Sequence, residues 1–321
     1  MPRRDILKAM ELVPVDNLQI GLAPAERRAE AFELAFSSLP ETERRGLAEQ
    51  ALRKAAVADA AALFEARRDG RLLGALYCEL QLGGSAGLWA PQIAAEAADD
   101  AAFAERCAGE LLQAAIAWLA ARRVRVVQSL LTTDSGRDAE RLRAAGFTHP
   151  ADLLYLVSLA NSFPAAPIET DLSFEPLTAR SDDELAELLE GTYEQTLDCP
   201  ALNGVQDCRE VLAGYRATGS FDHANWFFVR RDGQDVGCLL LADFPDVNQY
   251  LLVYMGLLPA ARGQGLGIEL VRHAQWLCGR AGRARLVLAV DAENSPAINI
   301  YAAAGFIAWD RRSVWLRVLE S

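Results

Sequence analysis

Two groups of residues in the second half of the chain have types and spacings that suit chemistry on a phosphorylated ligand. The first is the loop Arg262-Gly263-Gln264-Gly265-Leu266-Gly267, and the second runs from Asn294 to Phe306 and contains Tyr301. Glycines let a backbone approach a ligand closely, and helix N-termini attract phosphate through unpaired N–H groups. A tyrosine hydroxyl can give a proton to a leaving group. Together these groups predict a pyrophosphate cradle followed by a tyrosine that faces the same cleft.

A strand and a helix must position the loop. Residues 250–258 are rich in apolar and aromatic side chains, which favours a buried strand before the loop. After it, apolar residues recur at helical spacing, namely Leu266, Leu270, Ala274, Leu277 and Cys278. The glycine-rich turn is therefore predicted to lie at a helix N-terminus, where the helix dipole favours a bound anion.

The local charge agrees with an anionic ligand. The chain has 32 Lys and Arg against 44 Asp and Glu, a net charge of −12, yet residues 262–285 contain five arginines and a single acid, Glu269. A basic segment in an acidic protein suits a multiply phosphorylated ligand. Alternatively, Arg280, Arg283 and Arg285 complement the C-terminal end of the same helix.

The second group follows a short apolar run, residues 285–290, that fits a buried parallel strand. After it, Ser295 suits a helix N-cap and Pro296 the first helical position. In the short helix that follows, Ala297 and Tyr301 fall on one face. The pattern predicts a tyrosine hydroxyl beside a small residue, although an aromatic ring on an apolar helix face is more usually part of the core.

Both motifs resemble those of the GNAT superfamily of acetyl-coenzyme A-dependent acyltransferases. The pyrophosphate loop of that family, R/Q-x-x-G-x-G/A, matches Arg262, Gly265 and Gly267, and its N-x-x-A-x-x-x-Y-x-x-x-G-F pattern matches Asn294, Ala297, Tyr301, Gly305 and Phe306. The two motifs occur in the family's order, joined by a helix and a strand. The resemblance covers residues 171–321 and implies an α/β (α+β) fold with a twisted, mixed, mostly antiparallel sheet flanked by helices.

The resemblance implies that acetyl-CoA is a co-substrate and that an amine attacks its thioester directly. The backbone at Leu257 and Leu258 would hold the pantetheine arm and polarise the thioester carbonyl, while Tyr301 would protonate the departing thiolate. Asn294 would bind near the pantetheine or order the end of the strand. The residues that the resemblance assigns to the cofactor are Leu257, Leu258, Arg262, Gly263, Gln264, Gly265, Leu266, Gly267, Ile268, Asn294 and Ala297.

The sequence leaves the general base open. Some members of the family carry a glutamate on the strand before the loop, but an ungapped alignment brings Leu251 to that position, and leucine accepts no proton. The remaining candidates are Tyr254, Asp243, Asp246, Glu194, Asp198, Cys199 and His223. Cys199 is not expected to act as a nucleophile, because the sequence pairs it with no His and carboxylate. No metal is expected, since six cysteines and three histidines show no ligand spacing.

The first half of the chain is similar to a degenerate copy of the second. Arg67-Arg68-Asp69-Gly70 recurs 163 residues later as Arg230-Arg231-Asp232-Gly233, and Ala145-Gly146-Phe147 recurs 159 residues later as Ala304-Gly305-Phe306. Where the glycine loop belongs, the first copy has residues 92–100, without glycine and with three acids. At the tyrosine position it has Leu142. This copy is expected to fold, with a helix at 101–121 and a strand at 124–131, but not to catalyse.

These patterns predict tandem GNAT-like domains: a degenerate domain at 1–160 without the cofactor motif, a linker at 161–170 and an acetyltransferase domain at 171–321. The proline-containing segment 161–167 breaks regular structure and supports the boundary. The mycothiol synthases share this plan of two halves with the active one at the C-terminus. The first half is either a wall for the substrate or an inherited stabilising mass.

Composition limits the surroundings and partners of the protein. With 51% hydrophobic and 24% charged residues it fits an ordinary globular protein. No N-terminal signal core is apparent, and no apolar run approaches the roughly 20 residues of a membrane span. We expect a cytoplasmic monomer or homodimer that binds neither membrane nor nucleic acid. The negative net charge favours a cationic or amine substrate.

The predicted function is an N-acetyltransferase that moves an acetyl group from acetyl-CoA to a primary amine of a small molecule or peptide. The alternatives are a non-catalytic acetyl-CoA-binding sensor or scaffold, and an acyltransferase that uses another acyl-CoA. Specificity is expected within residues 193–226. There, residues 196–204 form either a loop that faces the acceptor or a simple turn.

Overall fold

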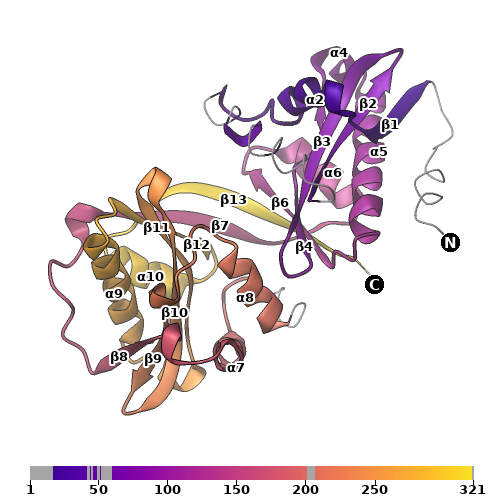
Figure 1. Cartoon of the computed structure of the whole chain (residues 1–321). Coiled ribbons are helices and arrows are strands. Elements are labelled where there is room, and N and C mark those ends of the chain that lie inside the picture. Colours follow the sequence, from indigo (N-terminus) through magenta and orange to yellow (C-terminus); the bar gives the residue numbers. More distant parts are fainter. Residues whose placement is uncertain are drawn as a thin grey trace. The chain divides into compact units, whose positions relative to one another are not determined.

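The structure of the chain is a computed structural model that describes residues 17–41, 44, 46–48, 51, 60–200 and 207–319. The chain divides into two compact units. We call residues 149–314 the C-terminal unit, and residues 1–148 together with 315–321 the N-terminal unit. Each unit combines a twisted, mostly antiparallel sheet with flanking helices, which confirms the expected fold class (Figure 1).

The C-terminal unit contains the sheet that the two motifs flank. Its strands follow one another across the sheet in the order β7-β12-β11-β10-β9-β8, and β11 and β12 are its parallel pair. The strands are β7 (Thr148–Leu159), β8 (Leu172–Pro176), β9 (Trp226–Arg231), β10 (Gln234–Phe244), β11 (Gln249–Leu257), β12 (Arg285–Asp291) and β13 (Ile307–Val318), which begins beside β7. The helices are α7 (Asp182–Tyr193), α8 (Cys208–Arg216), α9 (Leu266–Arg280) and α10 (Ser295–Ala303), with 3-10 turns at Ala160–Ser162, Leu177–Ala179, His223–Asn225, Pro245–Val247 and Pro259–Ala261.

Helices cover both faces of this sheet. Leu239 and Leu241 of β10 pack into the cluster that contains the buried residues of α9 and Tyr301 of α10. Cys238 and Leu240, on the opposite face, pack with α7 and α8. In Figure 1, α9 and α10 accordingly lie on one side of the sheet and α7 and α8 on the other. Burial on both faces explains why β10 is an unbroken apolar run rather than an alternating one.

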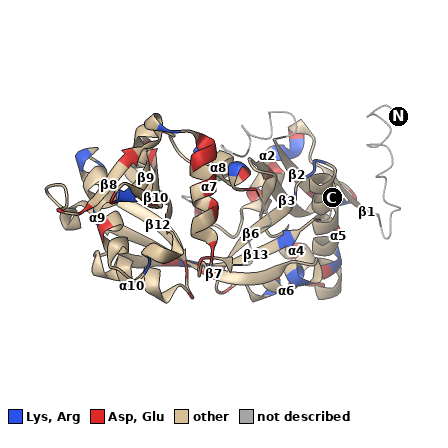
Figure 2. Ribbon diagram, turned by 90° about the horizontal axis from the view of Figure 1, so that it is seen from below, with Lys and Arg blue, Asp and Glu red and all other residues tan. Residues whose placement is uncertain are grey.

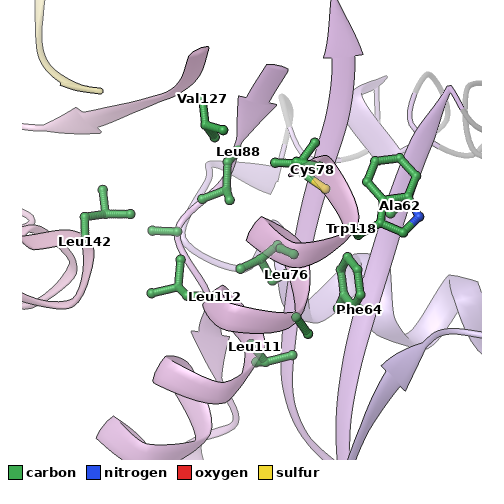
Figure 3. Close-up of a cluster of buried hydrophobic side chains, with 14 of the residues drawn as sticks. Ala62, Phe64, Leu76, Cys78, Leu88, Leu111, Leu112, Trp118, Val127 and Leu142 are labelled. Carbon is green, nitrogen blue, oxygen red and sulfur yellow. The ribbon is translucent and has the colours of Figure 1, made fainter. Parts of the chain in front are cut away.

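The N-terminal unit repeats this order of elements. Its strands are β1 (Leu18–Leu22), β2 (Ala61–Arg68), β3 (Arg71–Gln81), β4 (Ser85–Leu88), β5 (Gln92–Ile93) and β6 (Val126–Thr132). Its helices are α2 (Arg28–Ala35), α4 (Ala95–Ala98), α5 (Ala101–Ala120) and α6 (Gly136–Ala144), with a 3-10 turn at Ala25–Arg27. Figure 3 shows its core, in which Leu111 and Leu112 of α5 lie beside Leu76 and Leu142 is also buried.

The turns that suggested a repeat have the same backbone geometry in both copies. Asp69 and Gly70 link β2 to β3 with φ of 52° and 80°, and Asp232 and Gly233 link β9 to β10 with φ of 49° and 76°. Both turns place consecutive residues in the left-handed region, which Asp and Gly tolerate. The repeated helix-ending glycines, Gly146 and Gly305, have φ of 82° and 85°.

The two units do not divide where the sequence places the boundary. The sequence assigns residues 148–159 to the first domain, whereas β7 pairs antiparallel with β12 from Leu159 opposite Arg285 to Leu153 opposite Asp291 and lies in the C-terminal unit. Conversely, residues 315–321 belong to the N-terminal unit, where the Leu319 amide donates to the Arg125 carbonyl at 2.8 Å. The last strand of the first half therefore completes the second unit, and the end of the last strand of the second half belongs to the first.

Two features are absent from the residues that the structure describes. None of their helices is long and apolar enough to cross a membrane. They also contain no group of three or more His, Cys, Asp or Glu side chains arranged to hold a metal ion.

Candidate active site

The glycine-rich loop forms the start of α9, as its sequence predicts. Gly263 and Gly265 have φ of 73° and 81°, and Gly265 is the residue directly before the helix. A Cβ added to either glycine would meet no atom within 4 Å, so the space beside the loop is open. No side chain caps α9. Its first N–H groups are therefore left for solvent or for a bound anion.

Gly267 has a different role from the other two glycines. It is buried in the first turn of α9, and a Cβ there would lie 2.7 Å from Cδ1 of Ile300 on α10. The missing side chain thus lets α10 pack closely against the start of α9. In this way Gly267 helps to place Tyr301, which α10 carries, near the loop.

The Arg262 side chain is engaged with the backbone of its own unit. Its guanidinium donates to three carbonyl oxygens, those of Leu257 at 3.0 Å, Thr192 at 2.8 Å and Gln195 at 3.2 Å. These bonds join the end of β11 to the end of α7 and hold the entry to the loop. The structure therefore gives this arginine a positioning role, while its main chain remains at the loop.

The two parallel strands part beside the loop. β11 and β12 pair only from Gln249 opposite Arg285 to Leu251 opposite Val287, although both strands continue further. The pairing of β10 with β11 also shifts register between Leu240 and Leu241, which bends β11. Among the described residues, this edge of β11 has no strand partner beyond Leu251. Unpaired edge groups can bond an extended ligand as they would bond another strand.

The backbone groups at the end of β11 are partly used within the protein. Leu258 N–H donates to the Val236 carbonyl at 2.9 Å, and the Leu257 carbonyl accepts from Arg262. The unpaired edge groups of β11 therefore lie earlier in the strand than the two leucines that the sequence assigned to the cofactor. The remaining cofactor candidates, Gln264, Leu266 and Ile268, lie in or directly after the loop, where Gln264 is exposed and Leu266 is buried.

Tyr301 lies on the inner face of α10. It is 7% exposed and its ring centroid lies 5.6 Å from that of Phe306. Burial, followed by the negative charge of Asp198, raises the pKa of its phenol above the ordinary value. The hydroxyl is therefore protonated at neutral pH and can act as a proton donor.

Asn294 caps α10. Its Oδ1 accepts from the backbone N–H of Ala297 at 3.3 Å, and the helix begins at Ser295. The predicted cap, Ser295, is therefore wrong by one residue, because Asn caps a helix as well as Ser and here reaches the third amide. The structure thus shows Asn294 as a helix cap, and its two predicted roles, near the pantetheine or in ordering the strand end, stay predictions.

A cavity of about 460 Å³ opens where β11 and β12 part. Tyr254 reaches it from β11 and Ala289 from β12, and α7 and α8 form its other walls. It is lined by Leu153, Ala186, Glu187, Glu190, Tyr193, Thr196, Asp198, Cys199, Asp207, Cys208, Arg209, Val211, Tyr215, Tyr254 and Ala289. The predicted specificity segment, residues 193–226, contributes many of these, while residues 201–204 of its loop lie outside the described part of the chain.

Three tyrosines form one wall of the cavity. The Tyr254 ring lies 5.5 Å from that of Tyr193 and 6.0 Å from that of Tyr215. The hydroxyls of Tyr193 and Tyr215 are 3.2 Å apart. Burial raises the pKa of all three phenols, so this wall is neutral and aromatic, and such a wall suits a cation.

Two aspartates join the loop that contains Asp198 and Cys199 to the end of β12, and we call this pair of hydrogen bonds the latch. The Asp291 N–H donates to Asp198 Oδ1 at 2.9 Å, and the Cys199 N–H donates to Asp291 Oδ2 at 3.1 Å. Asp198 is exposed to the cavity, but the protein atoms around its carboxyl and the nearby Asp291 raise its pKa. Burial raises the pKa of the Cys199 thiol to about 12, which leaves it as a neutral thiol.

The structure separates the candidates for the general base. Asp198, Cys199 and Tyr254 line the cavity, whereas Glu194, Asp243, Asp246 and His223 are not among the lining residues. Asp243 is held by two bonds of 2.7 Å from Arg283.

The three arginines at and after the end of α9 contact other residues of the protein. Arg283 pairs with Asp243, and the Arg285 guanidinium donates to the Val247 carbonyl at 3.2 Å. The Arg280 guanidinium lies 5.1 Å from the centre of the Trp276 ring. These contacts engage all three side chains within the protein, so they give no support for a phosphate ligand at this end of α9.

Sequence reasoning did not identify the acidic wall of the cavity. Glu187 and Glu190 are exposed and lie one turn apart on α7, whose ribbon Figure 2 colours red at several acidic residues. Their spacing and the capping box of Ser181 and Glu184 predict a helix with one acidic face. The sequence could not show that this face looks into a cavity.

Comparisons with known proteins agree with this arrangement. Residues 184–306 match the acetyltransferase (GNAT) family. A segment of 61 residues is 34% identical to the mycothiol acetyltransferase of Renibacterium salmoninarum, and it covers 19% of this chain and 18% of that relative. The match therefore spans about a fifth of the relative's length.

Solved structures share the fold. A GCN5-related N-acetyltransferase from Sphaerobacter thermophilus is similar, with a TM-score of 0.63 and 15% identity over 96% of this chain and 98% of that one. A tandem GNAT protein from the clavulanic acid biosynthesis pathway is also similar, with a TM-score of 0.52 and 16% identity over 95% of this chain and 99% of that one. At these identities the likeness shows the fold alone.

Proposed function

We propose that residues 171–321 transfer an acetyl group from acetyl-CoA to a primary amine of a small molecule or peptide, because residues 184–306 match the acetyltransferase (GNAT) family. One observation carries the proposal. The uncapped start of α9, the parting of β11 from β12 and the cavity that contains Tyr254 and Ala289 lie together in one unit.

The residues of the site fit acetyl-CoA. The amides at the start of α9 and the open space beside Gly263 and Gly265 suit a pyrophosphate. The unpaired edge of β11 suits the amide groups of pantetheine, and it leads to the cavity. This order places the thioester where the strands part, with the cavity on one side for the acceptor.

The chain's own residues then position the reactants and move protons. The β11 backbone orients the thioester carbonyl, and the cavity holds the amine so that its nitrogen attacks the carbonyl carbon. As the carbon–sulfur bond breaks, the buried Tyr301 hydroxyl donates a proton to the departing thiolate. No covalent acyl-enzyme is needed, and the neutral thiol of Cys199 is a poor nucleophile.

The proposal extends to surroundings and partners. The acceptor is a small-molecule or peptide amine. The acidic residues of α7 and the tyrosines in the cavity wall suit an amine that carries a positive charge. We place the enzyme in the cytoplasm, where acetyl-CoA is available, and assign it no role on nucleic acid or membranes. The net charge of −12 argues against binding to nucleic acid.

Calorimetry with acetyl-CoA tests the cofactor site. Gly265→Val should abolish binding, because valine at φ 81° distorts the loop and its side chain enters the open space beside it. Gly282→Val is the matched control, since Gly282 also has a positive φ (69°), also faces open space and lies just beyond the other end of α9. Loss of binding in the control alone, or binding that survives Gly265→Val, would contradict the site.

A further inference from the structure

An acceptor amine must lose a proton before it can attack. A primary alkylamine has a pKa near that of lysine, about 10.4, so at neutral pH it enters the site as an ammonium ion without a lone pair. The proposed transfer therefore needs a group in the cavity wall that takes this proton.

Most titratable groups of the wall cannot do so. The phenols of Tyr193, Tyr215 and Tyr254 have raised pKa values and are already protonated. Burial also raises the pKa of both wall thiols, Cys199 and Cys208. The four carboxylates remain, and they are Glu187, Glu190, Asp198 and Asp207.

These carboxylates differ in what surrounds them. Glu187, Glu190 and Asp198 are all exposed, but the first two lie on α7 and not in the loop that is joined to the end of β12. Asp207 caps α8, where its Oδ1 accepts from the Arg209 N–H at 2.7 Å. Asp198 lines the cavity, and its Oδ1 accepts from the N–H of Asp291 at the end of β12 at 2.9 Å. It thus lies on the side of the cavity where the strands part and where the reaction is placed.

We infer that Asp198 is the general base of the proposed acetyl transfer: its carboxylate accepts the proton of the acceptor ammonium in the cavity. The inference rests on the function proposed above. The latch supports it, because Oδ1 of Asp198 is held by the Asp291 amide while Cys199 N–H is held by the Asp291 carboxylate. The base is thereby fixed to β12, one of the strands that part around the thioester.

The protons balance in this scheme. Asp198 takes one proton from the ammonium and later releases it to solvent. The freed nitrogen lone pair forms the new carbon–nitrogen bond, the carbon–sulfur bond breaks, and Tyr301 protonates the thiolate. The second N–H proton of the attacking nitrogen then restores the phenol. The products are the acetylated amine, the free thiol of CoA and one proton.

The electrostatics of Asp198 suit a base. Burial raises the pKa of its carboxyl above the ordinary aspartate value; the Asp291 N–H bond lowers it and the Asp291 negative charge raises it, but burial is the largest effect. The carboxylate is therefore a stronger proton acceptor than that of an ordinary aspartate. The titratable groups that face it, on four other elements and on its own loop, are Asp291 of β12, Tyr301 of α10, Tyr215 of α8, Tyr254 of β11 and Cys199.

The test compares Asp198→Asn with wild type in acetyl transfer to putrescine and to hydroxylamine, followed as free thiol. The amide keeps an Oδ1 that can accept from Asp291, so the latch survives while the proton acceptor is lost. We expect the rate with putrescine, a dication, to fall about 100-fold or more. The rate with hydroxylamine, which is neutral at neutral pH, should change much less. Glu194→Gln, a nearby exposed carboxylate outside the cavity wall, should behave as wild type.

The outcomes separate the base from the function. A wild type that binds acetyl-CoA but acylates neither probe nor any amine of a broader panel overturns the proposed function and the base with it. An Asp198→Asn variant that keeps wild-type activity with putrescine overturns the base alone. Equal losses with both probes also overturn it, because they indicate a structural role of the loop.

Discussion

The starts of α5 and α9 occupy the same place in the two copies of the fold but differ in how their amides are satisfied. In the N-terminal unit, Asp100 precedes α5 and its side chain accepts from the Phe103 N–H at 3.1 Å. In the C-terminal unit, Gly265 precedes α9 and no side chain caps it. A carboxylate cap uses an N–H group at the helix start and its negative charge repels phosphate. The N–H groups of an uncapped helix start can bind phosphate. We therefore propose that this one residue distinguishes the copy that holds a phosphorylated cofactor.

The strands next to these helices are alike in both units. β4 pairs in parallel with β6 over three residue pairs, from Ser85 to Gly87, and β11 pairs in parallel with β12 over three, from Gln249 to Leu251. The short parallel pairing is therefore common to both units. What differs is the helix start and the later helix: Leu142 and Tyr301 are both buried in the core of their unit, but Tyr301 carries a hydroxyl.

The largest effect should come from copying the first unit's cap into the second. Gly265→Asp places a carboxylate where the pyrophosphate is proposed to bind, on a backbone of φ 81°, so charge and strain act together. We expect acetyl-CoA affinity to fall by more than about 100-fold, a loss of roughly 3 kcal/mol, as measured by calorimetry. Unchanged affinity would remove the basis of the comparison.

Tyr301→Phe tests the second difference between the units. The ring and its packing on Phe306 remain, and only the hydroxyl is lost. We expect kcat to fall about 100-fold, as for the removal of a general acid, with little change in acetyl-CoA affinity. If kcat is unchanged, Tyr301 is a core aromatic residue, as Leu142 is a core aliphatic one.

The raised pKa of Asp198 should also make the free energy of unfolding depend on pH. The folded pKa of Asp198 lies above its unfolded value, so the native state binds more protons between the two values. Stability is therefore expected to fall as pH rises from about 3.9, the ordinary aspartate pKa, through the folded value. Urea unfolding of wild type and Asp198→Asn should show the variant gaining relative stability across this range. A constant difference at all pH values would contradict the shift.

The smallest effect should come from removing the cap of the first unit. Asp100→Ala leaves the Phe103 amide unsatisfied and should lower the free energy of unfolding by about 1 kcal/mol. Acetyl-CoA binding, assigned to the other unit, should not change in calorimetry. Weaker binding in this variant would show that the first unit takes part in the site.

Local sequence patterns were sufficient to predict the glycine-rich helix start and the repeat of the fold. The helix start at Leu266, the strand at Arg285 and the paired glycines Gly146 and Gly305 all follow from short-range rules of backbone conformation and periodicity. The cap of α10 differed by one residue, because Asn294 and Ser295 are equally good caps and only the geometry of the turn selects between them.

The sequence by itself determined that the second half has a glycine-rich helix start without a capping side chain, followed by a tyrosine on a short helix. Tertiary structure decided which residues meet. It placed β7 in the C-terminal unit, used the Arg262 side chain to tie β11 to α7, and brought Asp198 to Asp291 and Tyr301. Strand pairing and loop docking join residues about a hundred positions apart, and their free energy depends on partners that no local window contains.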